Sequence, residues 1–296
     1  MGRIIALYGK RIQADAAQVF KHLMGLLVRR GFSVVCEEQA ANSLEDYGIA
    51  KESFDGIYSE KSLAELKPEV VLSIGGDGTF LGAASLVKDL EIPILGINCG
   101  RMGFLANVAK SEVDKAIEHI ANGNYSISHR DVLGYKVEDG TVEGFALNEV
   151  SILKSDMASL LMLHVYIDGS YLTTYWADGL VISTPTGSTA YSMSAGGPIV
   201  CPDCRLLLLT PVSPHNLNLR PMAIPAASQL EVQVESRSGD YVLCGDSEMY
   251  KLSDENKVKI STATYGIKVV KLPGASFYET IRKKLYWGED MRNSKY

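Results

Sequence analysis

The stretch "VVLSIGGDGTFLGAA", residues 70–84, decides the fold and raises the question of function. An apolar run ends in glycines at 75, 76 and 78 that enclose one carboxylate, Asp77, and helical spacing begins near Thr79. A strand that feeds a helix through glycines sets backbone N–H groups and the positive end of the helix dipole at a sheet edge. Open α/β sheets bind ligands at that edge, and the N–H groups suit phosphate.

Asp77 is the unusual member of this turn, because a carboxylate repels phosphates unless it holds a cation or faces a hydroxyl group. It could bind Mg²⁺ or take the proton of an attacking alcohol. The alternative is an Asx turn that only stabilises the loop. The glycines allow positive φ and a close approach of a ligand, so we predict that Gly75, Gly76 and Thr79 bind phosphate. The spacing is that of neither a P-loop nor GxGxxG.

Strand and helix patterns alternate from the N-terminus to about residue 125, which predicts a parallel sheet covered on both faces. The expected strands are 3–9, 32–37, 69–76 and 92–98, and the expected helices are 13–30, 79–87 and 111–123. We therefore predict a doubly wound α/β domain over residues 1–125.

Between residues 126 and 272 the pattern changes to strand after strand, which predicts a second, β-rich domain. Residues 160–179 are expected to form a hairpin that turns at Asp168–Gly169, and residues 229–246 to form another. Residues 276–287 return to helical spacing. The fold class is α/β plus β, with residues 273–296 packing back on the first domain.

Composition limits the partners. The net charge of −6 argues against nucleic acid, because phosphate backbones favour clustered Lys and Arg. No apolar run reaches the roughly 18–20 residues that cross a bilayer, and the N-terminus lacks a signal-peptide core. We expect a cytoplasmic protein with no membrane partner. The five cysteines are expected to be reduced, with "CPDC" at 201–204 as a turn, because no second ligand pair stands nearby.

Two more stretches have the composition of binding segments. Residues 176–200, "WADGLVISTPTGSTAYSMSAGGPIV", set one ring, Tyr191, among small residues against which a planar ligand could lie. In "FALNEVSIL", residues 145–153, Asn148 and Glu149 interrupt an apolar strand. This pair could bond adenine and ribose, or it could mark a bulge or a strand end.

Together these stretches resemble the NAD kinase family. The matching sequences are "GGDGTFL" (75–81), "GINCGRMGFL" (96–105), "LNE" (147–149), "DGLVISTPTGSTAYSMSAGGPI" (178–199) and "HNLNLRP" (215–221). The glycine–aspartate turn alone is shared with diacylglycerol kinases, sphingosine kinases and phosphofructokinases. Its combination with "TPTGSTAYS" and "NE" is specific to the family that the chain resembles.

The resemblance implies that the chain phosphorylates the 2′-hydroxyl group of the adenosine ribose of NAD to make NADP. ATP would be the donor, or polyphosphate as in some members, with a divalent cation such as Mg²⁺. A homodimer or homotetramer is also implied. The rival hypotheses are a lipid or sugar kinase with the same turn, for which no clear apolar entry groove exists, and a non-catalytic NAD(P)-sensing module, which would have no need of Asp77.

Residue by residue, the resemblance makes Asp77 the proton acceptor, with Gly78 beside it at the NAD and Phe104 as a wall. Asn148 and Glu149 would hold the adenosine part, and Asp178 would lie nearer the nicotinamide end. The remaining pocket residues would be Thr189, Ala190, Tyr191, Ser192, Met193 and Ser194. The chain departs from the family's pattern at Trp176, where many members have a basic residue, and at Glu248, a predicted NAD-binding position where Gln is usual.

Overall fold

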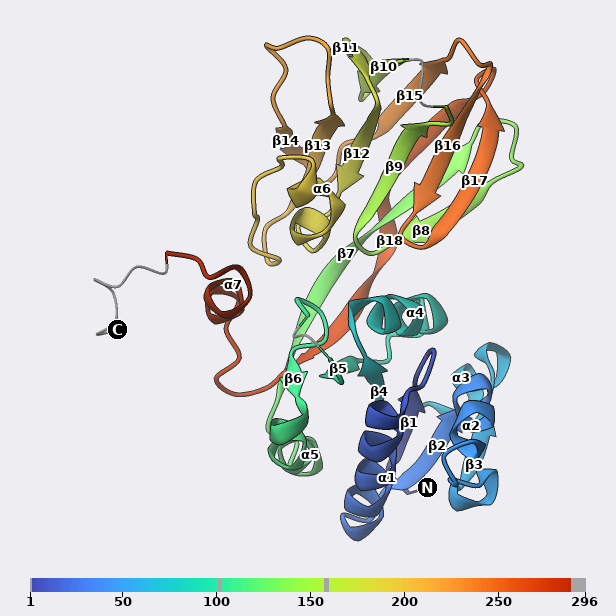
Figure 1. Cartoon of the computed structure of the whole chain (residues 1–296), viewed down its shortest axis with the longest axis vertical. Helices are drawn as coiled ribbons and strands as arrows, with labels where there is room; N and C mark the ends of the chain where they lie inside the picture. The colour runs from blue at the N-terminus through green and yellow to red at the C-terminus, as the bar shows by residue number, and fades with distance from the viewer. Residues whose placement is uncertain (1, 101–102, 157–159, 289–296) are drawn as a thin grey trace. The chain divides into compact units, whose positions relative to one another are not determined.

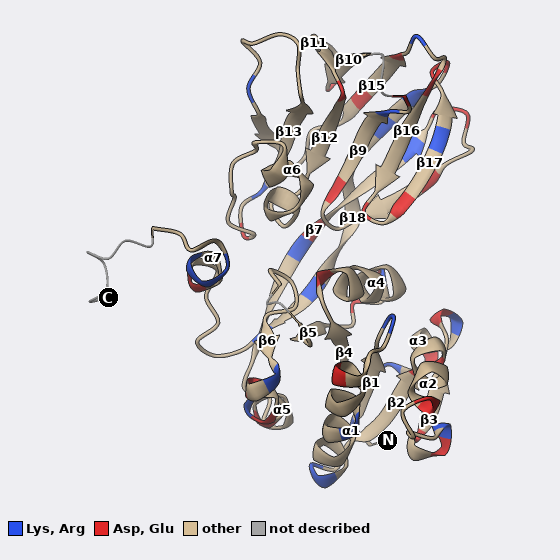
Figure 2. Ribbon diagram, viewed as in Figure 1, with Lys and Arg blue, Asp and Glu red and all other residues tan. Residues whose placement is uncertain are grey.

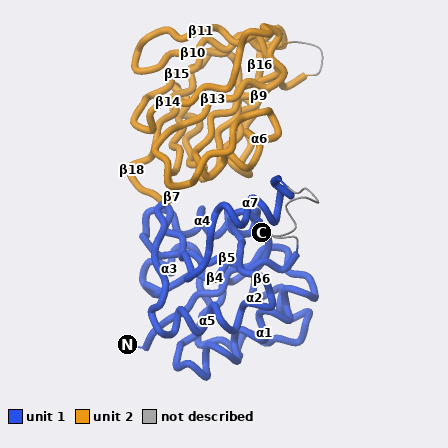
Figure 3. Tube along the Cα trace, turned by 90° about the vertical axis from the view of Figure 1, so that its left-hand side faces the viewer, with its two compact units in different colours: residues 1–129, 267–296 blue, residues 130–266 orange. Residues whose placement is uncertain are grey.

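The computed structural model describes residues 2–100, 103–156 and 160–288, and its chain forms two compact units (Figure 3). Unit 1 comprises residues 1–129 and 267–296, and unit 2 comprises residues 130–266. The domain limits predicted from the sequence lie at 125/126 and 272/273. The family-like stretch 96–105 includes Arg101 and Met102, which lie outside the described residues, as do residues 289–296.

Unit 1 contains a parallel sheet, as the alternating pattern predicts. Its strand order is β3 (Gly56–Tyr58), β2 (Ser33–Glu37), β1 (Ile4–Tyr8), β4 (Val70–Gly75) and β5 (Ile94–Asn98). The free edge of β5 pairs with β6 (Val108–Ala109) and, at one residue, with the end of β18 (Lys257–Lys271). Strand β4, which leads into the glycine–aspartate turn, is therefore central in this sheet.

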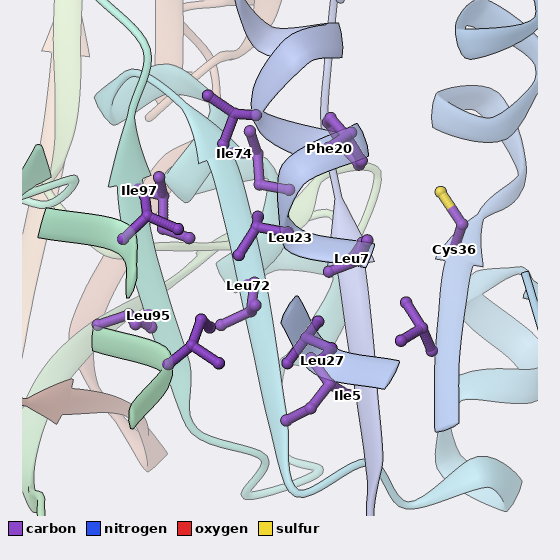
Figure 4. Close-up of a cluster of buried hydrophobic side chains, with 14 of the residues drawn as sticks. Ile5, Leu7, Phe20, Leu23, Leu27, Cys36, Leu72, Ile74, Leu95 and Ile97 are labelled. Atoms are coloured by element: carbon purple, nitrogen blue, oxygen red, sulfur yellow. The ribbon is translucent and has the colours of Figure 1, made fainter. Parts of the chain in front are cut away.

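Helices cover both faces of this sheet. On one face, Leu72 and Ile74 of β4 share a core with α1 (Ala14–Arg29) and α5 (Val113–Ala121) (Figure 4). Side chains alternate along a strand, so Val71 and Ser73 face the other way. That side is covered by α4 (Asp77–Val87), whose Phe80 is fully buried. The prediction of a doubly wound domain is confirmed.

The sequence patterns missed four short elements of unit 1, which are α2 (Glu38–Glu45), β3, α3 (Glu60–Leu66) and β6. The 3₁₀ turns η1 (Lys51–Ser53) and η2 (Lys110–Glu112) were also not predicted. Helix α2 follows β2 without a loop, because the Glu37 carboxylate caps it by accepting the Ala40 N–H at 2.8 Å. A strand that changes directly into a helix leaves no turn residues for the pattern to register.

Unit 2 is a sandwich of two antiparallel sheets (Figure 1). One sheet has the order β14 (Met222–Pro225), β13 (Leu206–Val212), β12 (Gly179–Ser183), β9 (Glu149–Lys154), β16 (Asp240–Gly245) and β17 (Glu248–Ser253). The other has β11 (Ser170–Ala177), β10 (Leu161–Ile167), β15 (Leu230–Glu235) and β18, with β7 (Ser126–Val137) on β18 and β8 (Glu143–Ala146) on β7. Val150 and Ile152 of the first sheet share one core with Leu161 and Leu163 of the second.

The hairpin expected at Asp168–Gly169 is confirmed. Strands β10 and β11 pair antiparallel, and both turn residues have positive φ, 50° and 79°. The hairpin expected over residues 229–246 is wrong. Strand β15 pairs with β10 and β18, whereas β16 pairs with β9 and β17 in the opposite sheet. The short turn between them crosses the sandwich, and strands with one buried face give the same alternation in either arrangement.

Helix α7 (Phe277–Leu285) belongs to unit 1, in agreement with the predicted return of the chain to the first domain. Its apolar side chains Phe277, Ile281 and Leu285 are half-buried, whereas Tyr286 is exposed. Among the described residues, no helix combines the length and the apolar character that a membrane crossing requires.

Candidate active site

The glycine–aspartate turn of unit 1 is tighter than the sequence predicts. Gly75 ends β4 with φ +156°, and a side chain there would collide with Thr79. Helix α4 begins at Asp77 rather than near Thr79, with Gly76 as its N-cap. Gly76 has φ −99° and Gly78 lies inside the helix, so the positive φ expected at these glycines occurs at Gly75 alone. The turn thus has one position, Gly75, that requires glycine.

The N-terminus of α4 offers donors to an anion. The N–H groups of Thr79 and Phe80 donate to the Gly76 carbonyl at 3.0 and 3.1 Å. Those of Asp77 and Gly78 come earlier and lack an acceptor within the helix. Thr79 has a side chain that is only 9% exposed and packs beside Gly75. Its predicted contact with phosphate would therefore have to come from its backbone.

The Asp77 carboxylate holds a loop of the same unit. Oδ2 accepts the Phe104 N–H at 2.9 Å, and Oδ1 accepts those of Leu105 and Ala106, each at 3.0 Å. A Cβ at Gly103 would collide with the carboxylate, so only glycine fits there. Asp77 therefore does stabilise a loop, as the alternative interpretation of this residue holds. Its hydrogen-bond partners, however, are residues 104–106, far along the chain, rather than the neighbours of an Asx turn.

Asn98 supports the same loop from the end of β5. Its Oδ1 accepts the Gly100 N–H at 2.8 Å, and its Nδ2 donates to the Ala106 carbonyl at 3.2 Å. The side chain is 4% exposed, so this pair of bonds is buried. Sequence analysis did not single out Asn98, and a polar residue at the end of an otherwise apolar strand was the available signal.

Phe104, the predicted wall residue, lies beside a lysine. The Lys284 ammonium of α7 stands 4.2 Å from the centre of the Phe104 ring and 3.7 Å from Asp77 Oδ2. Unit 1 therefore brings together Gly75, Gly76, Asp77 and Phe104, as predicted, and adds a cation that the sequence did not reveal.

In unit 2, Asn148 and Glu149 lie at a break between two strands, which was one of the alternatives that the sequence analysis left open. The chain leaves β8 at Ala146 and enters β9 at Glu149. Asp246 fixes this break, since its carboxylate accepts the N–H groups of Leu147, Asn148 and Glu149 at 2.7, 2.9 and 3.2 Å. Asp246 was missed by sequence analysis, because its partners lie on a segment remote from its own strand end.

Glu149 has an unusual environment. Burial and the neighbouring Asp246 raise its pKa to about 8, while a hydrogen bond from the Tyr191 N–H acts in the opposite direction. Its Oε2 is buried and has no hydrogen-bond partner in the described part of the chain. An ionisable oxygen without a partner is costly unless a ligand satisfies it. Burial also raises the pKa of Asp246. Glu149 is therefore the strongest ligand-binding candidate of unit 2.

The segment 184–200 is held against this strand break. Thr184 donates through Oγ1 to the Leu147 carbonyl at 2.7 Å and through N–H to the Asn148 carbonyl at 2.9 Å. Gly187 lies so close to the Asn148 backbone that a Cβ would collide with it. The segment contains η3 (Gly187–Thr189) and α6 (Tyr191–Ser194) instead of an open loop.

The predicted pocket residues on this segment differ in exposure. Thr189, Ala190, Tyr191 and Met193 are half-buried, and Ser194 is exposed. Ser192 is fully buried, and its hydroxyl bonds to Thr210 at 2.9 Å. The Ser192 side chain thus has no surface for a ligand, and its role is to hold the segment.

Trp176 lies near the end of β11, and Asp178 lies between β11 and β12. The Asp178 carboxylate pairs with Lys154 at 2.6 Å, and both side chains are partly exposed. Trp176, which stands where a basic residue is usual, is 49% exposed. Lys154 is thus a nearby positive charge beside the predicted nicotinamide-end residue.

Glu248 occupies an exposed position at the start of β17. Its Oε2 accepts the hydroxyls of Tyr250 at 2.9 Å and Tyr135 at 3.3 Å. Burial and the Glu248 charge raise the pKa of Tyr135. The predicted NAD contact of Glu248 would have to form beside these tyrosine bonds.

Within the described part of the chain, no cluster of three or more His, Cys, Asp or Glu residues could hold a metal ion. The described cysteines are free, and the Cys204 N–H donates to the Cys201 carbonyl at 3.0 Å. This bond fits the turn expected for "CPDC".

Comparison with known families gives matches in both units. The model described as ATP-NAD kinase N-terminal domain matches residues 5–125, and that described as ATP-NAD kinase C-terminal domain matches residues 147–272. The chain is 40% identical over 293 residues to an NAD kinase of Flavobacterium johnsoniae. This alignment covers 98% of the present chain and 99% of that relative. The chain is also 40% identical to an NAD kinase of Bacteroides fragilis, with 97% and 99% covered.

Two solved structures share the fold. A yeast NADH kinase complexed with NADH superimposes with a TM-score of 0.87 at 23% identity, covering 98% of this chain and 89% of that one. An NAD kinase from Archaeoglobus fulgidus in complex with ATP gives a TM-score of 0.74 at 21% identity, with 96% and 98% covered. At these identities the structures support the fold, and the predicted α/β plus β class is confirmed.

Proposed function

The chain belongs to the NAD kinase family, and we propose that it transfers the terminal phosphoryl group of ATP to the 2′-hydroxyl group of the adenosine ribose of NAD, which gives NADP. Relatives at about 40% identity over nearly the whole chain carry that activity in their names. The lipid-kinase, sugar-kinase and sensor hypotheses have no comparable support, since NAD kinase models match both halves of the chain.

The observation that carries the mechanism is the position of Asp77 on α4. Its Oδ1 is occupied by two N–H groups, whereas Oδ2 accepts only the Phe104 N–H among the residues that the structure describes and keeps room for another hydrogen bond. The Asp77 side chain is 33% exposed, so a substrate hydroxyl could reach Oδ2. Asp77 accepts the proton of the ribose hydroxyl through Oδ2, as general-base catalysis requires.

The donor phosphates bind at the N-terminus of α4. The N–H groups of Asp77 and Gly78 and the positive end of the helix dipole favour an anion there. Gly75 and Gly76 keep side chains out of the approach. Phosphoryl transfer needs positioning and charge stabilisation more than a nucleophile on the protein, and this turn supplies both.

A divalent cation fits this turn in a limited way. Mg²⁺ is usually held by one or two carboxylates together with substrate phosphates, and Asp77 is the carboxylate available at the turn. When bound with ATP, Mg²⁺ would neutralise charge on the phosphates.

NAD binding falls to unit 2. Glu149 Oε2 needs a partner, and a ribose hydroxyl would supply one. Asn148, held by Asp246, is placed beside it, and the half-buried Tyr191 ring offers a face to the adenine. Thr189, Ala190 and Met193 complete this surface, with Asp178 toward the nicotinamide end. We assign Ser192 to support alone.

The cellular setting of the proposed reaction is the cytoplasm, and the active form is a homodimer or homotetramer, as family membership suggests. Sedimentation that shows only a monomer under assay conditions would contradict the assembly.

The direct test incubates the purified chain with NAD, ATP and Mg²⁺ and measures NADP with an NADP-specific dehydrogenase. We expect NADP to accumulate in step with ADP. The control replaces NAD with NADP, whose adenosine ribose has no free 2′-hydroxyl group and which should release no ADP above background. A folded protein that makes no NADP with ATP or polyphosphate, across several divalent metals, would refute the function.

A further inference from the structure

The last turn of α7 brings a positive charge to the glycine–aspartate turn of unit 1. Lys284 Nζ lies 3.7 Å from Asp77 Oδ2 and 4.2 Å from the centre of the Phe104 ring. The Lys284 and Asp77 side chains are 29% and 33% exposed, so the pair is open to solvent on one side. Ammonium, carboxylate and ring thus stand together beside the N-terminus of α4.

Fold stability does not account for this arrangement. An N···O distance of 3.7 Å is longer than a hydrogen bond, and partly exposed ion pairs contribute little to stability. Asp77 already accepts three N–H groups of the 104–106 loop, so its place in the fold does not depend on Lys284. Lys284 donates no hydrogen bond to any residue that the structure describes. Its three N–H donors therefore remain available to a ligand.

The neighbouring lysine shows what an ordinary surface pairing on this helix looks like. Lys283 is 57% exposed and pairs with Glu279 one turn earlier at 2.7 Å. Lys and Arg residues gather along α7 (Figure 2), yet among the described residues of this helix Lys284 is the one that contacts the glycine–aspartate turn. Lys283 is thus a matched control for Lys284, with the same charge at the adjacent position.

The proposed reaction creates a charge problem at this turn. ATP would bring several negative oxygens to a place that already holds the Asp77 carboxylate, and like charges at such distances repel. A lysine ammonium is a compact charge with rotatable donors, and it serves elsewhere as a phosphate ligand. The face of an aromatic ring attracts such a cation and would keep it in place when the substrate is absent.

We propose that Lys284 is a further catalytic residue, one that donates a hydrogen bond to the phosphates of the donor nucleotide at the Asp77 turn. Phe104 holds the ammonium ready, and Asp77 keeps its charge partner close until the phosphates arrive. The inference rests on the proposed function and extends it to the C-terminal helix.

The test compares Lys284→Met, Lys284→Arg and the control Lys283→Met. Loss of one charge-assisted bond to phosphate should raise the Kd of ATP, measured by calorimetry with Mg²⁺, by about ten- to a hundredfold in Lys284→Met. The KM for ATP should rise with it, while the KM for NAD changes by less than about threefold. Lys284→Arg should recover most of the ATP affinity, and Lys283→Met should match the parent.

Unchanged ATP affinity in Lys284→Met would overturn the proposal. So would an equal loss in Lys284→Met and Lys284→Arg, or an equal loss in Lys283→Met, because then the positive charge at this position is not what matters. Melting temperatures of all variants show whether binding is compared among folded proteins. The binding titration needs no turnover, so a parent that binds ATP but makes no NADP would refute the proposed function and leave Lys284 to be judged by affinity.

Discussion

Two carboxylates, one in each unit, each accept three consecutive backbone N–H groups, but their surroundings differ. Asp77 accepts the N–H groups of residues 104–106, and Asp246 accepts those of residues 147–149. Asp77 is partly exposed and has Lys284 beside it, whereas burial raises the pKa of Asp246. Holding a loop therefore does not distinguish a structural carboxylate from a reactive one. Access from solvent does.

The substitution Asp77→Asn should have the largest effect and should separate the roles of the two carboxylates. We expect kcat to fall by about 10²–10⁴, because the amide cannot accept a proton from the ribose hydroxyl. One amide oxygen can still accept from Leu105 and Ala106, but the NH₂ group would face the Phe104 N–H. Stability should therefore fall by only about 1–2 kcal/mol. The measurement is kcat against melting temperature.

A near-parental kcat in Asp77→Asn would leave Asp77 with the loop alone. If the melting temperature collapses, Asp77→Glu serves as the second variant, since it keeps the carboxylate and shifts it by one methylene. A folded Asp77→Glu with parental kcat would equally contradict a positioned base.

Asp246→Asn should give the opposite balance. The buried amide would oppose at least one of the N–H groups of residues 147–149, which should cost about 1–3 kcal/mol of stability. We expect the KM for NAD to rise, because Asn148 and Glu149 lose their anchor, while kcat falls by no more than about tenfold. Thermal unfolding and steady-state kinetics measure the two effects. A loss of kcat as large as that of Asp77→Asn would make the two carboxylates equivalent.

Tyr191→Ala tests whether the half-buried ring of Tyr191 binds the adenine base. Stacking of a base on an aromatic ring is worth about 1–3 kcal/mol, so the Kd of NAD should rise by roughly ten- to a hundredfold. The Kd of ATP should stay unchanged. Tyr191→Phe is the matched control, because it keeps the ring and removes the hydroxyl. Equal NAD affinity in the alanine variant and the parent would show that the ring only packs.

The smallest effect concerns the two neighbouring carboxyl groups of unit 2, Glu149 and Asp246. Glu149 has a pKa of about 8 in the folded protein, raised from an ordinary value of 4.5 by burial and by Asp246. Its favourable contribution is therefore complete below about pH 4.5 and is lost as the pH rises through 8. Relative to Glu149→Gln, the parent should lose at least about 1 kcal/mol of stability between pH 5 and pH 8. Calorimetric melting temperatures across this range measure it, and parallel curves for parent and variant would contradict the raised pKa.

Much of unit 1 could be predicted from sequence because its signals are local. Buried parallel strands are continuous apolar runs, and helix α1 shows its apolar face at helical spacing. Asp77 stood out because its glycine neighbours have no other evident use. The short β3 and α3 carried too few residues for a period to appear.

The features that could not be predicted from the sequence are contacts between distant segments of the chain. The 104–106 loop, Asp246 and Lys284 become relevant only through contacts with distant segments, and such contacts leave no spacing pattern along the chain. The prediction that β15 and β16 form a hairpin was wrong for a related reason. The alternation of apolar and polar residues indicates which face of a strand is buried, but not which sheet the strand joins. Glu248 is exposed and bonded to tyrosines, so its assignment rests on the family alone.

The loop held by Asp77 also provides a built-in spectroscopic probe. Because the amide hydrogens of Phe104, Leu105 and Ala106 all end on one carboxylate, they should exchange with solvent deuterium together rather than one by one. Their exchange rates would report whether the carboxylate is in place even in a variant that cannot turn over. In an isotope-labelled sample, three neighbouring signals would thus follow the geometry of the proposed general base, which assays of product formation cannot observe.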